Sequence, residues 1–221
     1  MRTRRPTLRI DLYVMAWRDS LLHPDHPSSL ILRTDIGKAH RVEVLESTRK
    51  LDDSIVAFTL EHLADWFTHQ HPLDDPIVKL TIYGRHNAVM NSINLAKSFV
   101  ASEIARRKSD HFGNDQPVYK SDSRWLRSSN PRPVADLCEG IVRYLYNVER
   151  FSIEVPGATT TSNKKTKRED KITKTLLQLQ SDAAHHAYNT VGIHDWVEQL
   201  EEARAVRKEI TKELVPQHLL D

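Results

Sequence analysis

Apolar residues recur at three- and four-residue steps along much of the chain, which is the spacing of one helix face. The clearest stretch runs from residue 195 to residue 214. Its shared face consists of Trp196, Leu200, Ala203, Ile210 and Leu214. Gly192 lies just before this stretch, Asp195 places a negative charge in the first turn, and Pro216 ends the pattern. The pattern predicts a helix over 195–214 that docks onto other helices.

The same spacing predicts six further helices and no strand. They are expected over residues 10–22, 29–49, 55–70, 76–108, 133–150 and 170–190. Gly37 in the second helix costs about 1 kcal/mol relative to alanine, and a break there is the alternative. Gly84 predicts a kink in the fourth helix. The chain has only six glycines, and its β-branched residues do not form alternating runs, which argues against an all-β fold.

Short connections between most of these helices favour antiparallel neighbours. The predicted fold is therefore all-α: an antiparallel helical bundle, either single and elongated or made of two packed sub-bundles. The longest connection, residues 110–130, separates a first bundle at 9–109 from a second at 131–221. Residues 1–8 are predicted to be a flexible basic arm, and residues 156–168 a flexible loop low in apolar content.

Composition narrows the functional classes only a little. Hydrophobic residues make up 39% of the 221 residues, charged residues make up 28%, and the net charge is +2. This balance does not by itself indicate nucleic-acid binding. No apolar window approaches the roughly 18 residues of a membrane span, and no signal peptide is evident. A cytoplasmic protein is expected.

Cys138 is the single cysteine, so the chain can form neither an internal disulfide nor a cysteine-based zinc site. It lies on the apolar side of its predicted helix. A buried, unreactive thiol is the expected state.

Histidine and carboxylate side chains are densest between His62 and Asp75. His62, Asp65 and His69 are spaced i, i+3 and i+7, which places them on one flank of the predicted helix. Imidazole and carboxylate groups are suitable ligands for zinc, iron or nickel. No established metal motif matches this spacing. A metal site is therefore one hypothesis, and a solvated polar flank is the other.

Basic residues gather in the amino-terminal arm and in the predicted loop. These candidate phosphate-contacting residues are Arg2, Arg4, Arg5, Lys164, Lys165, Lys167 and Arg168. Aromatic residues that could stack on bases are not interleaved with them. Weak nucleic-acid contact is thus an alternative to a solvated surface.

The sequence contains no glycine-rich dinucleotide motif, no P-loop and no nucleophile elbow. No cofactor is predicted. The leading functional hypothesis is a non-enzymatic helical interaction or structural module that binds a protein partner or self-associates. A nucleic-acid-associated protein is the first alternative, and a metal-dependent enzyme using the His62–Asp75 region is the second.

The C-terminal stretch resembles an uncharacterised all-helical family of Bacteroides-type bacteria. The matching residues are Val191, Gly192, Ile193, Asp195, Trp196, Val197, Leu200 and Ala203. Residues 176–179 also look similar, and residues 52–76 are loosely similar to helices in the first half of the family. The resemblance implies a bacterial protein with an all-helical fold. Its motif is a packing motif, so it implies no active site.

Overall fold

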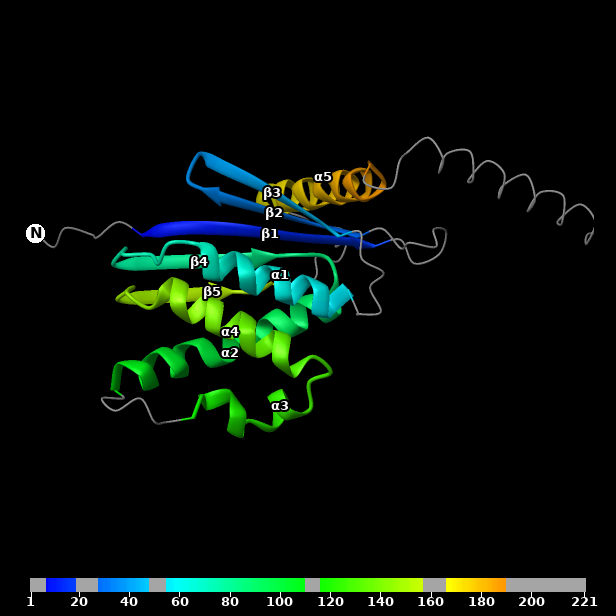
Figure 1. Ribbon diagram of the computed structural model, residues 1–221. Helices are drawn as coiled ribbons and strands as arrows, with labels where there is room; N and C mark the ends of the chain where they lie inside the picture. The colour runs from blue at the N-terminus through cyan, green and yellow to red at the C-terminus, as the bar shows by residue number, and fades with distance from the viewer. Residues whose placement is uncertain (1–6, 19–27, 48–54, 110–115, 157–165, 190–221) are drawn as a thin grey trace, which may run out of the picture.

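The centre of the protein is a five-stranded mixed β-sheet. The computed structural model describes residues 7–18, 28–47, 55–109, 116–156 and 166–189. The strands are β1 (Leu8–Arg18), β2 (Ser28–Ile36), β3 (Ala39–Ser47), β4 (Ile77–Tyr83) and β5 (Arg150–Glu154), in the spatial order β3-β2-β1-β4-β5 (Figure 1). β2 is antiparallel to β1 and β3, whereas β4 is parallel to β1 and β5.

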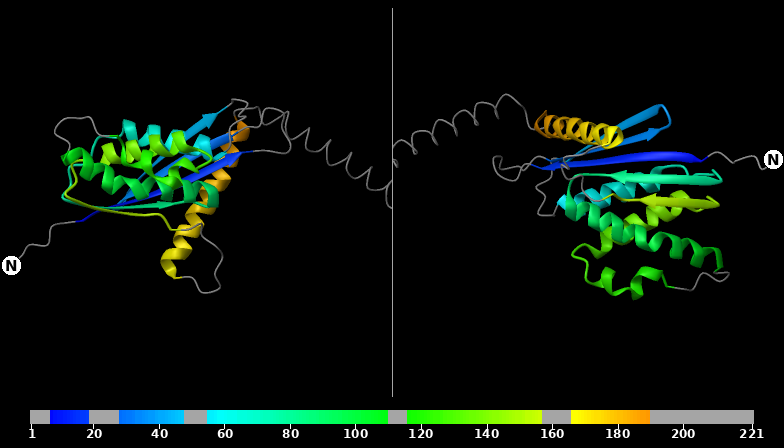
Figure 2. Two further views of the ribbon diagram at one scale, coloured as in Figure 1. Left: turned by 90° about the horizontal axis from the view of Figure 1, so that it is seen from below. Right: turned by 180° about the vertical axis from the view of Figure 1, so that it is seen from behind.

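Helices cover both faces of this sheet, but unequally (Figures 1 and 2). One face carries α1 (Ile55–His69), α2 (Asn87–Ser109) and α4 (Pro131–Leu145), and α5 (Lys167–Asn189) lies across β1 and β2 on the other. A short 3₁₀ helix, η1 (Val118–Ser121), and α3 (Ser123–Leu126) pack against α2 and α4. The fold is therefore α/β.

The predicted all-α bundle is wrong, and β1 shows why. Ile10, Leu12 and Val14 point into the core beneath α1, α2 and α4, whereas Tyr13 and Met15 point into the core beneath α5. A strand that is buried on both faces has no regular polar positions. Its continuous apolar run therefore also satisfies a helical spacing, which produced the predicted helix over 10–22.

As far as residue 47, the predicted helix over 29–49 is a β-hairpin instead. Ile36 pairs with Ala39, which leaves Gly37 and Lys38 as a two-residue turn. Gly37 has a φ of 62°, in the left-handed region that glycine adopts at little cost. The glycine that would have weakened a helix is thus the residue that allows the hairpin to turn.

The predicted helix over 76–108 combines a strand with a helix. β4 ends at Tyr83, and α2 begins at Asn87, so Gly84 marks a break and not a kink. β4 pairs with β5, which follows the predicted boundary at 110–130. Elements from both predicted sub-bundles therefore share one sheet and one main core.

Three predicted helices lie close to observed ones: 55–70 matches α1, 133–150 overlaps α4, and 170–190 matches α5. Phe151 and its neighbours, which follow α4, form β5. The predicted helix over 195–214 and the family-like residues 191–203 lie outside the described residues. The all-helical fold implied by the family resemblance does not fit this sheet-centred chain.

Glu103 ties the connection after α2 to the helical layer. Its side chain is fully buried and accepts hydrogen bonds from Arg106 (2.6 Å), Arg107 (3.0 Å) and the backbone N–H of Val118 (3.0 Å). Arg107 also pairs with Glu139 on α4. Burial alone would raise the pKa of Glu103, but the hydrogen bonds outweigh burial and lower this pKa to about 2.

Replacing Glu103 by glutamine tests this network. We expect Glu103→Gln to lower the free energy of unfolding by about 2–4 kcal/mol near neutral pH, because two arginines lose a buried charged partner. The pKa in the folded state lies below the ordinary 4.5, so the stabilisation is complete above that pH and is lost as the pH falls toward 2. The free energy of unfolding, measured with urea across this acidic range, should change less with pH in the variant than in the parent chain. If the free energy of unfolding depended on pH in the variant as it does in the parent chain, the role of Glu103 in this network would be contradicted. An equal loss of stability in Glu61→Gln, at an exposed position, would also contradict it.

Gly140 provides a second test, at the crossing of α1 and α4. A Cβ atom there would lie 2.9 Å from the backbone oxygen of Ala64 and 3.0 Å from Cβ of Phe67. We expect Gly140→Val to lower the free energy of unfolding by about 2 kcal/mol or more, because the helices must separate. Asp136→Val, on the exposed side of the same helix, is the matched control. Equal urea midpoints for the two variants would show that the crossing is not tight.

Candidate functional site

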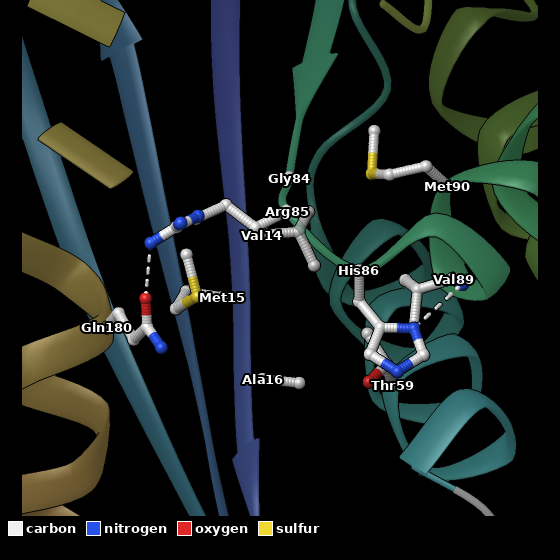
Figure 3. Close-up of a pocket in the computed structure, with 10 residues that line it drawn as sticks. All are labelled: Val14, Met15, Ala16, Thr59, Gly84, Arg85, His86, Val89, Met90 and Gln180. Carbon is white, nitrogen blue, oxygen red and sulfur yellow. Dashed lines mark hydrogen bonds between the residues drawn. The ribbon is translucent and has the colours of Figure 1, made fainter. Parts of the chain in front are cut away.

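The candidate site lies at the carboxyl end of β4, beside Val14, Met15 and Ala16 of β1. These strands are parallel neighbours, but β1 leads to β2 on one side and β4 leads to α2 on the other. In α/β sheets, ligands bind in the crevice outside the carboxyl ends of such strands. A pocket of about 280 Å³ lies at this position (Figure 3). Its lining residues are Val14, Met15, Ala16, Thr59, Gly84, Arg85, His86, Val89, Met90 and Gln180.

Gly84 sets the shape of the pocket floor. A Cβ atom on this residue would lie 2.5 Å from the sulfur of Met90 and 3.2 Å from the backbone oxygen of Val14. Glycine therefore allows the end of β4 to pass closely between β1 and the first turn of α2. This close passage brings the next two residues, Arg85 and His86, to the pocket mouth, where both are exposed.

Arg85 and His86 extend from the end of β4 in different directions (Figure 3). Arg85 reaches toward α5, where its guanidinium donates to the side-chain oxygen of Gln180. His86 lies beside Thr59 of α1, and its Nδ1 accepts a hydrogen bond from the backbone N–H of Val89 at 3.4 Å. A neutral imidazole whose Nδ1 accepts a hydrogen bond carries its proton on Nε2. Nε2 of His86 can therefore donate to a ligand.

The polar groups of the pocket are suited to an anion. The amino end of α2 carries a partial positive charge, with backbone N–H groups that the helix leaves without intrahelical acceptors. Arg85 adds a full positive charge, and His86 adds a donor. None of the described lining residues is Asp, Glu or Cys. The pocket therefore offers donors and positive charge, framed by apolar side chains from β1 and α2.

A second arginine lies at the same end of β4. The rings of Tyr13 and Tyr83 stack with centroids 5.1 Å apart, and Arg168 of α5 donates to the hydroxyl oxygen of Tyr83 at 3.2 Å. Burial, reinforced by the nearby carboxylates of Asp11 and Asp35, raises the pKa of Tyr13 to about 12. The Tyr13 phenol is therefore neutral near pH 7. The guanidinium of Arg168 extends the positive charge from the pocket toward the amino end of α5.

The proposed metal ligands His62, Asp65 and His69 all lie on α1. The ring of His62 packs edge-on against Phe58 at a centroid distance of 4.5 Å. Nδ1 of His69 lies 2.7 Å from the backbone oxygen of Asp65, while the Asp65 side chain is exposed. Within the described part of the chain, no three His, Cys, Asp or Glu side chains are grouped so that they could hold a metal. No structural observation therefore favours this hypothesis.

Only two of the proposed nucleic-acid contacts fall within the described residues. Lys167 and Arg168 form the first turn of α5, where a flexible loop was predicted as far as residue 168. Both are exposed, and Arg168 contacts Tyr83 as described above. The remaining candidates, Arg2, Arg4, Arg5, Lys164 and Lys165, lie outside the described residues.

Comparison with known protein families and with curated proteins finds no match for this chain. The fold and the pocket therefore carry the functional argument alone. No helix in the described ranges is both long and apolar enough to cross a membrane.

Sequence reasoning did not identify Arg85 and His86. The available signal was the run Gly84-Arg85-His86-Asn87, in which glycine and three polar residues interrupt a long apolar pattern. Recognising a strand before this run would have placed it at a strand-to-helix turn, where phosphate-binding sites commonly form. The error in the predicted secondary structure therefore concealed the site.

Cys138 lies outside this pocket, in the main core, and its side chain is fully buried. Burial, with smaller contributions from Glu139 and Glu103, raises the pKa of the Cys138 thiol from 9.0 to about 12. We expect folded protein to react with iodoacetamide at least about a thousandfold more slowly than unfolded protein, because the thiolate is both scarce and shielded. Mass spectrometry with and without guanidinium measures this ratio. Rapid labelling of the folded chain would contradict the burial of this thiol.

Proposed function

We propose that this protein is a non-enzymatic binding module that holds a phosphate-bearing ligand at the carboxyl end of β4, beside β1. One observation carries the proposal: Arg85, His86 and the first turn of α2 all border one pocket, and none of its described lining residues carries a carboxylate. Phosphate oxygens accept hydrogen bonds from a helix terminus and charge-assisted bonds from arginine.

The lining residues support binding more than catalysis. The hydroxyl of Thr59 donates to the backbone oxygen of Ile55 at 2.6 Å, so it is committed to its own helix. No described lining residue provides a thiol or a carboxylate that could act as nucleophile or metal ligand. We extend the proposal to a cytoplasmic protein, because a single buried thiol suits a reducing compartment.

A nucleic-acid strand is the alternative ligand, and Arg168 favours it. This residue lies at the same end of β4 as Arg85, and exposed Lys167 lies beside it on α5. Two or more cations in series suit the repeated phosphates of a strand better than a single phosphate group. Binding that weakens steeply with salt, with loss on replacement of both Arg85 and Arg168, would distinguish a strand from a small ligand.

A protein partner or self-association also remains a proposal. β3 and β5 are the outer strands of the described sheet, and an outer strand can add a strand from another chain. Sedimentation at several concentrations tests self-association. If the protein sediments as a monomer at every concentration, self-association is excluded and the partner would have to be a different protein.

Replacing Arg85 by alanine tests the phosphate site. We expect Arg85→Ala to weaken binding of pyrophosphate at least roughly tenfold, because a charge-assisted hydrogen bond contributes more than about 1.4 kcal/mol. Isothermal titration of the full chain with pyrophosphate, and separately with oligodeoxythymidylate, measures the effect. Arg132→Ala is the matched control, because that arginine is on α4 with a side chain 92% exposed. Equal affinities for both variants and the parent, or no binding to any of them, would refute the proposal.

A further inference from the structure

The outer strand β3 has an edge that is longer and less protected than the edge at the other side of the sheet. β3 pairs with β2 along all nine of its residues, without a bulge or a proline. β5, the other outer strand, has five residues, and Pro156 follows shortly after it. Short strands, bulges and prolines are common protections of an outer strand against pairing with another chain. β3 has none of these three protections.

The half of β3 nearest the turn is its most accessible part. Figures 1 and 2 show that this end of the β2–β3 hairpin extends beyond α5. All four residues from Ala39 to Val42 are exposed. Two of the five large hydrophobic side chains that are exposed in the described chain, Ile36 and Val42, belong to this hairpin. An accessible edge with apolar side chains is the kind that pairs with a further strand.

The two-residue turn determines which backbone groups of β3 point away from β2. Residues that flank such a turn, here Ile36 and Ala39, form a hydrogen-bonded pair, and these pairs alternate along an antiparallel ladder. The backbone N–H and C=O groups of His40, Val42 and Val44 therefore point toward the open edge. If the β3 strands of two copies pair, each of these residues must lie opposite another of them.

The charges of β3 favour one of these registers. Arg41 and Glu43 lie on the same face of the sheet, where they form an ion pair at 3.0 Å. When Val42 of one copy lies opposite Val42 of the other, each Arg41 lies opposite the Glu43 of the second copy. The neighbouring registers place Arg41 opposite Arg41, or Glu43 opposite Glu43. Opposite charges across an antiparallel pair stabilise it and like charges destabilise it, so the register centred on Val42 is preferred.

We propose that two copies of the chain pair through β3, in the antiparallel register centred on Val42, so that their sheets join. The two Arg41 and two Glu43 side chains then form a cluster of alternating charges, because each residue also keeps its partner in its own strand. The two Val42 side chains lie beside each other and lose part of their exposure to water. This inference rests on the self-association proposed above and does not depend on the phosphate site.

A second copy fits this edge better than a strand from a different protein. An antiparallel partner has to present an acid opposite Arg41 and a base opposite Glu43, one on each side of an apolar residue. A second copy meets this requirement by symmetry, and it uses the same residues on both sides, as closed dimers do. A different protein as the partner predicts that the isolated chain stays monomeric.

Charge reversal followed by mixing tests the register. Arg41→Glu gives a strand with glutamate at both positions, and Glu43→Arg gives a strand with arginine at both. Neither variant is complementary to itself, but the two are complementary to each other when the pairing is centred on Val42. Sedimentation equilibrium of the full chain measures the parent, each variant and their equimolar mixture. The mixture also controls for misfolding, because unfolded variants would not recover association.

Glu154→Arg is the matched control. Glu154 lies on the other outer strand and forms an ion pair with Lys79 at 2.6 Å, so this substitution also reverses one charge and breaks one surface ion pair. Arg85→Ala tests independence from the phosphate site. It should form dimers as the parent does, while Arg41→Glu should bind pyrophosphate as the parent does. A failure of one proposal is therefore distinguishable from a failure of the other.

We expect the parent and Glu154→Arg to form dimers, and each of the two β3 variants to raise the dissociation constant of the dimer at least about tenfold. The mixture should recover association, and native mass spectrometry should find one copy of each variant in its dimers. A parent chain that is monomeric at every concentration would overturn the proposal. So would dimers that persist in both β3 variants, or a mixture that associates no better than its components.

Discussion

The parallel pairing of β1 with β4 is the constraint on which the rest of the structure depends. β1 is central, and both of its faces are buried, so its register fixes which side chains enter each core. At the end of this pairing Gly84 passes close to β1, and a Cβ atom there would lie 3.2 Å from the backbone oxygen of Val14. The turn that follows places Arg85 and His86 directly before α2, where both line the pocket from different sides. The candidate phosphate site is a direct result of how these two strands meet.

The helices were easier to predict than the sheet, and the reason is physical. α1 and α5 lie at the surface of the fold, so each keeps a polar side, and the 3.6-residue period is visible in the local sequence. β1 is buried between the layers, and a strand loses its alternating pattern when both faces are apolar. Local sequence could not distinguish this strand from a buried helix. β4 does alternate, with Lys79 and Thr81 between Val78, Leu80 and Ile82, but it is short and its apolar residues run on into those of α2. Gly37 and Gly84 were visible as interruptions, but their meaning depended on strands formed by distant residues.

The candidate site was hidden for the same reason. His62, Asp65 and His69 attracted attention because they are close in sequence, yet they remain spread along one helix. Arg85, Gln180 and Arg168 are brought to one end of β4 only by the folding of α5 across the sheet. A site assembled from segments about ninety residues apart leaves no local pattern.

The division of the apolar interior into two cores has a consequence for folding. The main core draws all its buried residues from Ile10 to Ile153, whereas the second core also needs Leu176, Leu179 and Ala183 of α5. The sheet and its three covering helices can therefore form before α5 docks on them. During that interval Tyr13, Met15, Ile31 and Tyr83 lack their cover and form an apolar strip on the sheet. Until α5 docks, this strip is an exposed apolar surface of the kind that makes folding intermediates prone to aggregate.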